Sequence, residues 1–330
     1  MKTKIIFFLA IIVLVVGGDW YYLSHKNKNK TTEDIKIKIG YLPVANALPL
    51  YLAIDKGYFS EVGLKVEPIK FESPNQIVDA LIAGNIEFSS PSTGMGVTAV
   101  SQAKNPNTLK VFALNGGAGP NNIDNVFLIK KDSVISSVND LKGKKVGIIP
   151  GIQWKILAQH IFDTEGLAVD KDVTIVELAL PMQLQALAMG QIDALLTLEP
   201  TKVIGESQDA VRDLVVGPMM KYIADPWWGG GGVVSVEFAI NNRETTKKVI
   251  AVFDRSIKEI TADPDSSRQY LKNYTPLTEE QTKLVPLPIF KMYTDFQDSD
   301  MAALQKFFDI FAQYKVIDNK VDARQLIYSD

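Results

Sequence analysis

The chain has 330 residues, more than a single hydrophobic core usually spans, so we expect two lobes. Its formal net charge is −3 and no basic patch stands out, which argues against a nucleic-acid partner. With no cysteine and only two histidines, the sequence excludes disulfides and cysteine-bound metals and disfavours a histidine-built metal site or catalytic triad, so we expect no metal and no cofactor.

The N-terminal residues have the pattern of a secretory leader. Two lysines precede an apolar run at residues 5–16, which is the order found in signal peptides. As a helix this run would cover about 18 Å, well short of a ~30 Å hydrocarbon core. We predict a signal peptide or membrane anchor at residues 1–18, a polar linker at residues 19–34 and a periplasmic location. The alternative is an uncleaved tether to the inner membrane through residues 5–23.

Two distant stretches of the chain share one pattern. Residues 77–90 read IVDALIAGNIEFSS and residues 184–200 read LQALAMGQIDALLTLEP, which aligns Gly84 with Gly190 at an offset of 106. Upstream, KIGYLP and KVGIIP match at an offset of 107. Each copy indicates a strand, a helix, a strand, an amphipathic helix and a strand, as expected of one supersecondary unit used twice. We predict two similar α/β lobes, each a sheet flanked by helices, with a ligand cleft between them.

The first lobe begins with a predicted strand and a helix whose junction is a candidate ligand site. Asn46 and Ala47 lie at the helix start, directly after the strand end. Helix N-termini present unpaired backbone N–H groups that suit anions, although a plain strand-to-helix turn is the ordinary alternative. The elements predicted here are strands at 35–41 and 64–71 and helices at 47–58 and 76–83.

A polar segment follows the next strand, predicted at 86–89. The sequence SSPSTGMG places hydroxyls at Ser90, Ser92 and Thr93, which either contact a ligand or cap the following helix. After a strand at 109–114, the glycine-rich NGGAGPNN lacks the spacing of a phosphate-binding loop. We expect it to be a loop at the cleft edge with Asn115 pointing inward.

In the second lobe, Gln153 and Trp154 occupy the helix start that mirrors residues 44–47. The Trp154 ring is either a stacking wall of the cleft or a plug in the core. Glu199 follows the third strand, where its carboxylate either receives a cationic ligand, caps the next helix or pairs with a surface lysine. The remaining predicted elements are strands at 126–130, 145–149, 172–178 and 192–197 and helices at 138–144 and 183–189.

The sequence DPWWGGGG has the most unusual composition in the chain. Adjacent residues of a strand point to opposite faces, so one of Trp227 and Trp228 is expected to face the cleft. Four glycines permit φ > 0, which favours a cleft wall with a loop beside the hinge over a flexible surface loop. A strand at 233–240 and helices at 246–261, 266–274 and 300–314 are predicted to return the chain to the first lobe.

Four stretches carry a family resemblance: GYLPVANALPLYLAIDKGYFSEVGLKVE, IVDALIAGNIEFSSPST, DLKGKKVGIIPG and LQALAMGQIDALLTLEP, in that order. Together they resemble the nitrate/sulfonate/taurine and thiamine-precursor (NMT1/THI5-like) group of ABC-transporter solute-binding proteins. The resemblance implies a type II periplasmic-binding-protein fold with two chain crossings, no catalytic activity, and a membrane permease and its ATPase as partners. It also implies ligand contacts from residues 44–47, 90–94, 151–154 and 199–201.

These observations predict a discontinuous first lobe at residues 35–128 and 233–330 and a second lobe at 129–232. The predicted function is that of a monomeric extracytoplasmic receptor of an ABC importer, which closes on a small molecule. The tryptophans and Glu199 favour a planar nitrogenous or cationic ligand such as a thiamine pyrimidine. The helix ends and hydroxyls favour a sulfonate, taurine or nitrate-type anion, so the ligand stays open.

Two other functions compete with this prediction. A thiamine-pyrimidine biosynthesis enzyme on the same fold is associated with a cysteine-rich motif and histidines, and this chain has no cysteine. In addition, Glu199 has no evident carboxylate or histidine partner for acid–base chemistry. A tethered sensory input module is expected to carry a C-terminal membrane helix or signalling domain, and the sequence ends at QLIYSD with neither.

Overall fold

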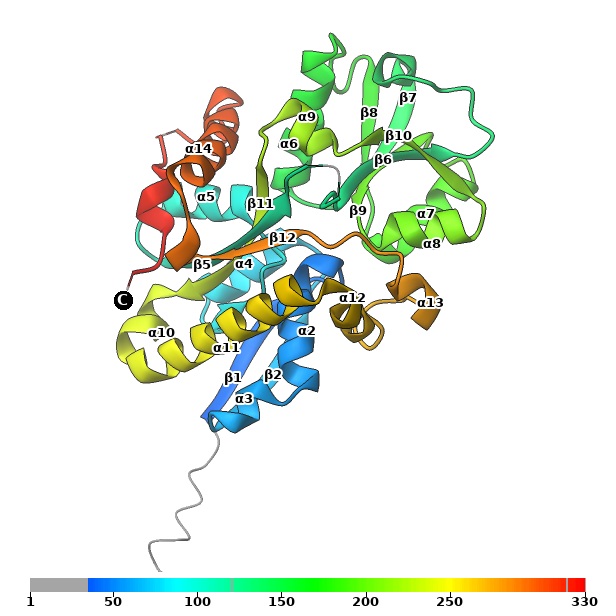
Figure 1. Ribbon diagram of the computed structural model, residues 1–330. Helices are drawn as coiled ribbons and strands as arrows, with labels where there is room; N and C mark the ends of the chain where they lie inside the picture. The colour runs from blue at the N-terminus through cyan, green and yellow to red at the C-terminus, as the bar shows by residue number, and fades with distance from the viewer. Residues whose placement is uncertain (1–34, 120, 319, 330) are drawn as a thin grey trace, which may run out of the picture. The chain divides into compact units, whose positions relative to one another are not determined.

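The computed structural model describes residues 35–119, 121–318 and 320–329. These residues form two β-sheets, each flanked by helices (Figure 1). The predicted leader at 1–18 and linker at 19–34 lie outside the described residues. No helix in the described ranges combines the length and the apolar character needed to span a bilayer.

The first sheet has seven strands in the order β12-β5-β11-β3-β1-β2, with the short β4 paired to β11. β1 and β3 run parallel, whereas β11 is antiparallel to both β3 and β5, and β12 is antiparallel to β5. The strands are β1 (Ile35–Tyr41), β2 (Leu64–Lys70), β3 (Phe88–Ser89), β4 (Thr93–Gly94), β5 (Leu109–Gly117), β11 (Trp227–Ser235) and β12 (Ile289–Met292).

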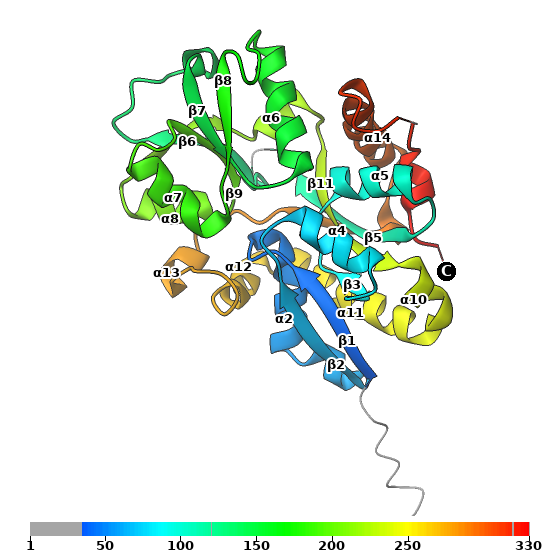
Figure 2. The ribbon, with the colours of Figure 1, turned by 180° about the vertical axis from the view of Figure 1, so that it is seen from behind.

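Helices cover both faces of the first sheet (Figures 1 and 2). α2 and α11 lie on one face, and α4 and α5 on the other, as the two opposite views show. Successive side chains of the strands point to opposite faces of the sheet. In β5, for example, Val111 and Phe112 belong to different hydrophobic clusters. The helices of this part are α2 (Leu48–Asp55), α3 (Tyr58–Glu61), α4 (Pro74–Ile82), α5 (Met95–Lys104), α10 (Val236–Asn241), α11 (Arg243–Ala262), α12 (Pro264–Ser267), α13 (Glu279–Thr282) and α14 (Asp298–Gln313).

The second sheet has five strands in the order β10-β6-β9-β7-β8. β7 runs parallel to β8 and β9, and β6 is antiparallel to β9 and β10. Phe127 of β6 packs in the cluster that holds α6, and Leu128 packs in the cluster that holds α7. The elements are β6 (Asn125–Lys130), β7 (Lys144–Ile148), α6 (Ile152–Thr164), β8 (Val173–Glu177), α7 (Leu180–Ala188), β9 (Ala194–Leu198), α8 (Thr201–Ser207), β10 (Val211–Val216) and α9 (Pro218–Tyr222).

The repeat seen in the sequence is also a repeat in space. Its first copy forms β3-β1-β2 and its second copy forms β9-β7-β8, with the middle strand first along the chain in both. Even the register is the same: Ile39 pairs with Phe88 in the first sheet, and Val146 pairs with Ala194 in the second. These pairs are related by the offsets of 107 and 106 found in the sequence. The two matching segments therefore build two separate, equivalent sheets.

Each sheet with its helices is called a lobe below. The chain leaves the first sheet after β5 and returns to it through residues 217–226, so it crosses between the sheets twice. β6 lies wholly in the second sheet and β11 wholly in the first. The predicted lobe limits at 128/129 and 232/233 fall inside these two strands and stay a prediction.

The glycine run at 229–232 corrects one expectation. It is part of strand β11 instead of a loop, and residues 236–240, predicted as strand, begin helix α10. None of the four glycines has a positive φ. They are required because neighbours approach closely: a Cβ at Gly232 would lie 2.5 Å from the Phe112 ring, and one at Gly231 would lie 2.7 Å from the Ala113 carbonyl oxygen.

Candidate functional site

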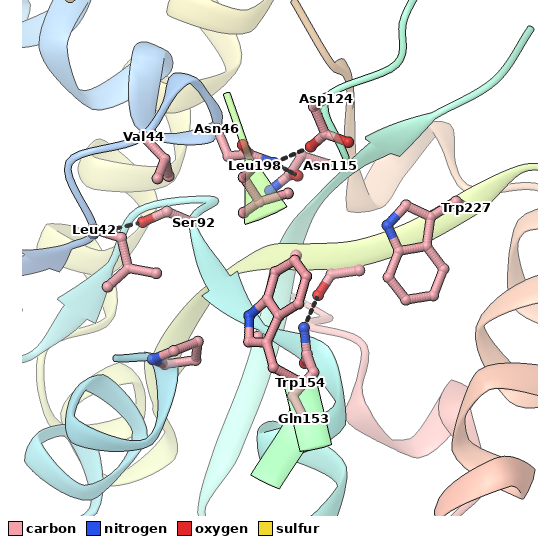
Figure 3. Close-up of a pocket in the computed structure, with 14 residues that line it drawn as sticks. Leu42, Val44, Asn46, Ser92, Asn115, Asp124, Gln153, Trp154, Leu198 and Trp227 are labelled. Carbon is pink, nitrogen blue, oxygen red and sulfur yellow. Dashed lines mark hydrogen bonds between the residues drawn. The ribbon is translucent and has the colours of Figure 1, made fainter. Parts of the chain in front are cut away.

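A cavity of about 30 Å³ lies where the ends of the repeated strands meet (Figure 3). A space of this size holds roughly one or two water molecules. Of the described residues that line it, none is Lys, Arg or His. Its polar walls are Asn46, Ser92, Asn115, Asp124 and Gln153, and its aromatic walls are Trp154 and Trp227.

Asn46 connects the first lobe to Asp124, the residue that precedes β6. Its Nδ2 donates to Asp124 Oδ2 at 2.6 Å and to Asn115 Oδ1 at 2.5 Å. Asn115 in turn donates to the Pro91 carbonyl oxygen. The three side chains are buried, and Figure 3 shows them turned toward one another. Asn115 lies within strand β5 rather than in the predicted loop.

Gln153 makes the mirror-image connection from the second lobe. It occupies the position in the repeat that Asn46 occupies in the first copy. Its Oε1 accepts from Gly96 N at 2.8 Å, and its Nε2 donates to the Gly229 carbonyl oxygen at 3.2 Å. Thus each copy of the repeat sends one amide side chain across the cavity to the other side.

The backbone amides at the two helix starts are already hydrogen bonded. Ala45 N donates to the Glu199 carbonyl oxygen at 3.4 Å, and at the equivalent position Ile152 N donates to Asn75 Oδ1 at 3.2 Å. Ala47, a predicted contact, is fully buried and is not part of the cavity wall. In this conformation the helix starts hold the lobes together instead of presenting these donors to an anion.

Of the three hydroxyl side chains predicted to contact a ligand, one lines the cavity and two stabilise the loop beside it. Ser92 lines the cavity, and its Oγ accepts from Leu42 N at 2.9 Å. Ser90 Oγ lies 2.7 Å from Ser92 Oγ, and Thr93 Oγ1 donates to Ser89 Oγ at 2.6 Å. Neither Ser90 nor Thr93 reaches the cavity wall, so both stabilise the loop.

Two of the three tryptophans predicted to contact a ligand line the cavity, and the third does not. Trp154 and Trp227 line the cavity, and the Trp227 ring also packs edge-on against Phe307, with centroids 4.7 Å apart. Trp228, on the other face of β11, does not line it. Its indole N–H has no hydrogen-bond partner within the described residues, and Lys291 Nζ lies 5.3 Å from its ring centroid. The expectation that one of the adjacent pair faces the ligand side fits Trp227, whereas Trp228 packs.

Glu199 is not the exposed carboxylate that a cationic ligand would need. Its side chain is buried and caps α8, since Oε2 accepts from Val203 N at 3.2 Å. Burial raises the pKa of Glu199 to about 8, so the group is mostly protonated at neutral pH. Of the alternatives weighed from the sequence, the structure places Glu199 as a helix cap.

Asp124 is a polar residue of the cavity wall that was not expected from the sequence. It is 2% exposed, and burial raises its pKa despite the hydrogen bonds from Asn125 and Asn46. Its only sequence signal is a lone acidic residue directly before the apolar strand β6, at the point where the chain crosses between lobes. Within the described ranges, no cluster of three or more metal-ligating acidic or histidine side chains is present.

Comparison with known proteins identifies similar chains. A sequence model of the family described as NMT1/THI5 like matches residues 44–267. A protein of Bacillus subtilis (strain 168) that is named as an aliphatic sulfonates-binding protein is 24% identical over 99% of this chain and 95% of its own length. A 4-amino-5-hydroxymethyl-2-methylpyrimidine phosphate synthase of Aspergillus parasiticus is 25% identical over 69% of this chain and 67% of its own.

A solved structure extends the likeness to the fold. The alkanesulfonate-binding protein SsuA from Xanthomonas axonopodis pv. citri, bound to MOPS, has a TM-score of 0.73 at 20% identity, covering 90% of this chain and 99% of that one. This likeness confirms the predicted two-lobed type II periplasmic-binding-protein fold.

Proposed function

Because this chain belongs to the NMT1/THI5-like family, we propose that it is the extracytoplasmic solute-binding receptor of an ABC importer. It is a binding protein and not an enzyme, in line with the relative that spans 99% of the chain and with the solved structure, which are both binding proteins. Its partners are a membrane permease and the ATPase that drives it. A signal or anchor segment at 1–18 would bring the chain out of the cytoplasm.

The observation that carries this proposal is the crossed pair of amides. Asn46 and Gln153 come from equivalent positions of two similar lobes, and each is hydrogen bonded to the opposite side of one cavity. A cavity walled by both lobes changes whenever the lobes move. A solute bound there therefore reports its presence through the relative position of the lobes.

The cavity also sets the order of events. At about 30 Å³ it is smaller than a sulfonate or a pyrimidine, so the lobes must separate before such a solute enters. A solute that contacts both lobes then favours the closed form by its extra affinity for that form. The permease would read the closed form.

The ligand candidates follow from the relatives and from the walls. The relatives are named for aliphatic sulfonates, for an alkanesulfonate and for synthesis of a pyrimidine phosphate. Trp154 and Trp227 offer aromatic faces to a planar or cationic group. The test panel is therefore methanesulfonate, taurine, nitrate and 4-amino-5-hydroxymethyl-2-methylpyrimidine.

The test measures solute binding by thermal unfolding and calorimetry, and it measures lobe separation by small-angle scattering. A solute at a hundredfold excess over its Kd stabilises the folded protein by about 2.7 kcal/mol, which a thermal unfolding curve resolves. Gln153→Ala removes both of its hydrogen bonds across the cavity, so it should weaken binding by roughly tenfold or more.

The control for that variant is Gln191→Ala, the same change at an exposed side chain, and it should bind as the wild type does. Small-angle scattering should show a more compact protein with ligand than without it. A ligand that binds without compaction, or with undiminished affinity for the Gln153→Ala variant, would contradict the receptor mechanism.

A further inference from the structure

Asp124 is a buried carboxylate in the cavity wall with no cation beside it. Its two oxygens accept from Asn46 Nδ2 at 2.6 Å and from Asn125 Nδ2 at 3.0 Å, and it forms no ion pair with any described residue. Asp300, equally buried, is paired with Lys291 at 2.8 Å. Burying a carboxylate without a counter-charge is costly, so the difference between the two acids calls for an explanation.

Asn46 adds a second acceptor to the same wall. Its Nδ2 is committed to Asn115 Oδ1 and Asp124 Oδ2, which fixes the orientation of the amide. Its Oδ1 is buried and has no partner within the described residues. Asn46 is 5% exposed and lines the cavity, so this oxygen is a buried acceptor beside the carboxylate. A donor on a bound molecule would satisfy this acceptor.

The backbone amides near the cavity that would hold an anion are used elsewhere. Gly151 N donates to Glu177 Oε2 at 2.9 Å, and Gly96 N donates to Gln153 Oε1 at 2.8 Å. The two equivalent helix-start amides, described above, are committed across the lobes. With no Lys, Arg or His among the described lining residues, an anion would face a carboxylate and few free donors.

We propose that the cavity selects a planar cation rich in N–H donors, of the guanidinium, amidinium or protonated amino-heterocycle class, with Asp124 as its counter-charge and Asn46 Oδ1 as its second acceptor. Trp154 and Trp227 present aromatic walls that favour such a cation. The ligand completes the ion pair that Asp124 lacks. This assignment rests on the receptor function proposed above and selects one of its ligand classes.

The experiment uses probes that match in shape and differ in charge. Guanidinium, urea and nitrate are planar molecules of similar size with positive, zero and negative charge, and benzamidine and benzenesulfonate form a larger pair. Binding of each at millimolar concentration is measured by calorimetry on the full chain. We expect the cation of each set to bind at least about tenfold more tightly than its anion.

The isosteric variant Asp124→Asn tests the assigned residue. It removes the charge and keeps the size, so affinity for the cations should fall by about tenfold or more while urea loses little. Asp132→Asn makes the same change at an exposed position and should bind as the wild type does. A purely structural role for Asp124 would weaken all probes together instead of changing the preference between charged and neutral ones.

Different results would contradict the cation assignment and the receptor function. If nitrate or benzenesulfonate binds and compacts the protein while the cations do not, the receptor function stands and the cation assignment is wrong. Equal cation binding by the wild type and Asp124→Asn also overturns the assignment, as does the failure of every cation probe to bind. If no solute of either panel changes the lobe separation, the receptor function itself fails.

Discussion

At the helix start that follows β1 the first copy of the repeat carries Asn46, and at the helix start that follows β7 the second copy carries Gln153. Both amides reach across the same cavity, yet their partners differ: a carboxylate for Asn46 and backbone groups for Gln153. The next position is Ala47 in one copy and Trp154 in the other. The two copies thus place side chains at equivalent points and differ in the chemistry that they bring there.

Behind the cavity the two copies agree closely. A Cβ at Gly40 would lie 2.6 Å from Ile86 Cδ1, and a Cβ at the equivalent Gly147 would lie 2.6 Å from Ile192 Cδ1. In each copy a glycine on the first strand admits the isoleucine that precedes the third strand. The packing behind the strands is thus the same in the two copies, while the side chains beyond the strand ends differ.

The largest effect is expected from truncating the two equivalent isoleucines, one in each copy. Ile86→Ala and Ile192→Ala each leave a cavity at a 1% exposed position, so each should lower the free energy of unfolding by about 2–5 kcal/mol, and by similar amounts. Denaturant titration measures both. Ile82→Ala, at a side chain that is 42% exposed, is the control and should change stability by about 0.5 kcal/mol or less. A large effect in only one lobe would show that the two isoleucine sites are not equivalent in their packing.

The next test concerns a position at which the copies differ, since Thr93 and Glu199 are equivalent. The pKa of Glu199 rises from 4.5 to about 8 on burial. Between these values the folded state holds a proton that the unfolded state lacks, so stability is full below the lower value and falls as pH rises. The loss is about 1.4 kcal/mol for each pH unit in the window.

Glu199→Gln keeps the helix cap and removes the ionisation, so its stability should decline less between about pH 5 and about pH 8 than that of the wild type. Urea titrations at the two pH values measure the difference. Parallel pH profiles for the two proteins would mean that Glu199 is already ionised in the folded state.

The smallest effect is expected from the residues that cap the helix starts. Ser73 Oγ accepts from Gln76 N at 3.3 Å and caps α4, whereas the equivalent N-cap residue of α7 is Ala179, which provides no side-chain cap. Ser73→Ala should cost about 1 kcal/mol, and Ala179→Ser should recover a similar amount in the second lobe. Thermal midpoints measure both, with the exposed Ser60→Ala as the control. If Ala179→Ser gives no gain, the two helix starts are not equivalent.

The framework could be predicted from the sequence because spacing alone carries it. Gly84 and Gly190 follow the ends of α4 and α7 with φ of 68° and 71°, as expected for glycines after a helix C-cap. The offsets of 106 and 107 also relate the pairing of β1 with β3 to that of β7 with β9. Local propensity and repetition agree at these positions, so the prediction needed no tertiary information.

The chemistry of the cavity could not be predicted in this way, because it depends on which groups meet after folding. Asp124 has no equivalent in the repeat, and its importance follows only from burial beside Asn46. Glu199 was expected as one of several alternatives to face the ligand, and burial makes it a neutral cap. Similarly, the glycines of β11 accommodate neighbouring atoms rather than unusual dihedral angles, which no local pattern reveals.

The glycine strand has a consequence for protein engineering. Gly229 and Gly230 give the cavity a floor of bare backbone, and a Cβ at Gly230 would lie 2.5 Å from Asn115 Nδ2 and 2.8 Å from the Pro91 carbonyl oxygen. Side chains introduced at these two positions would fill the cavity and clash with neighbouring atoms. Attempts to retarget the protein as a biosensor should instead vary the walls and leave the floor untouched.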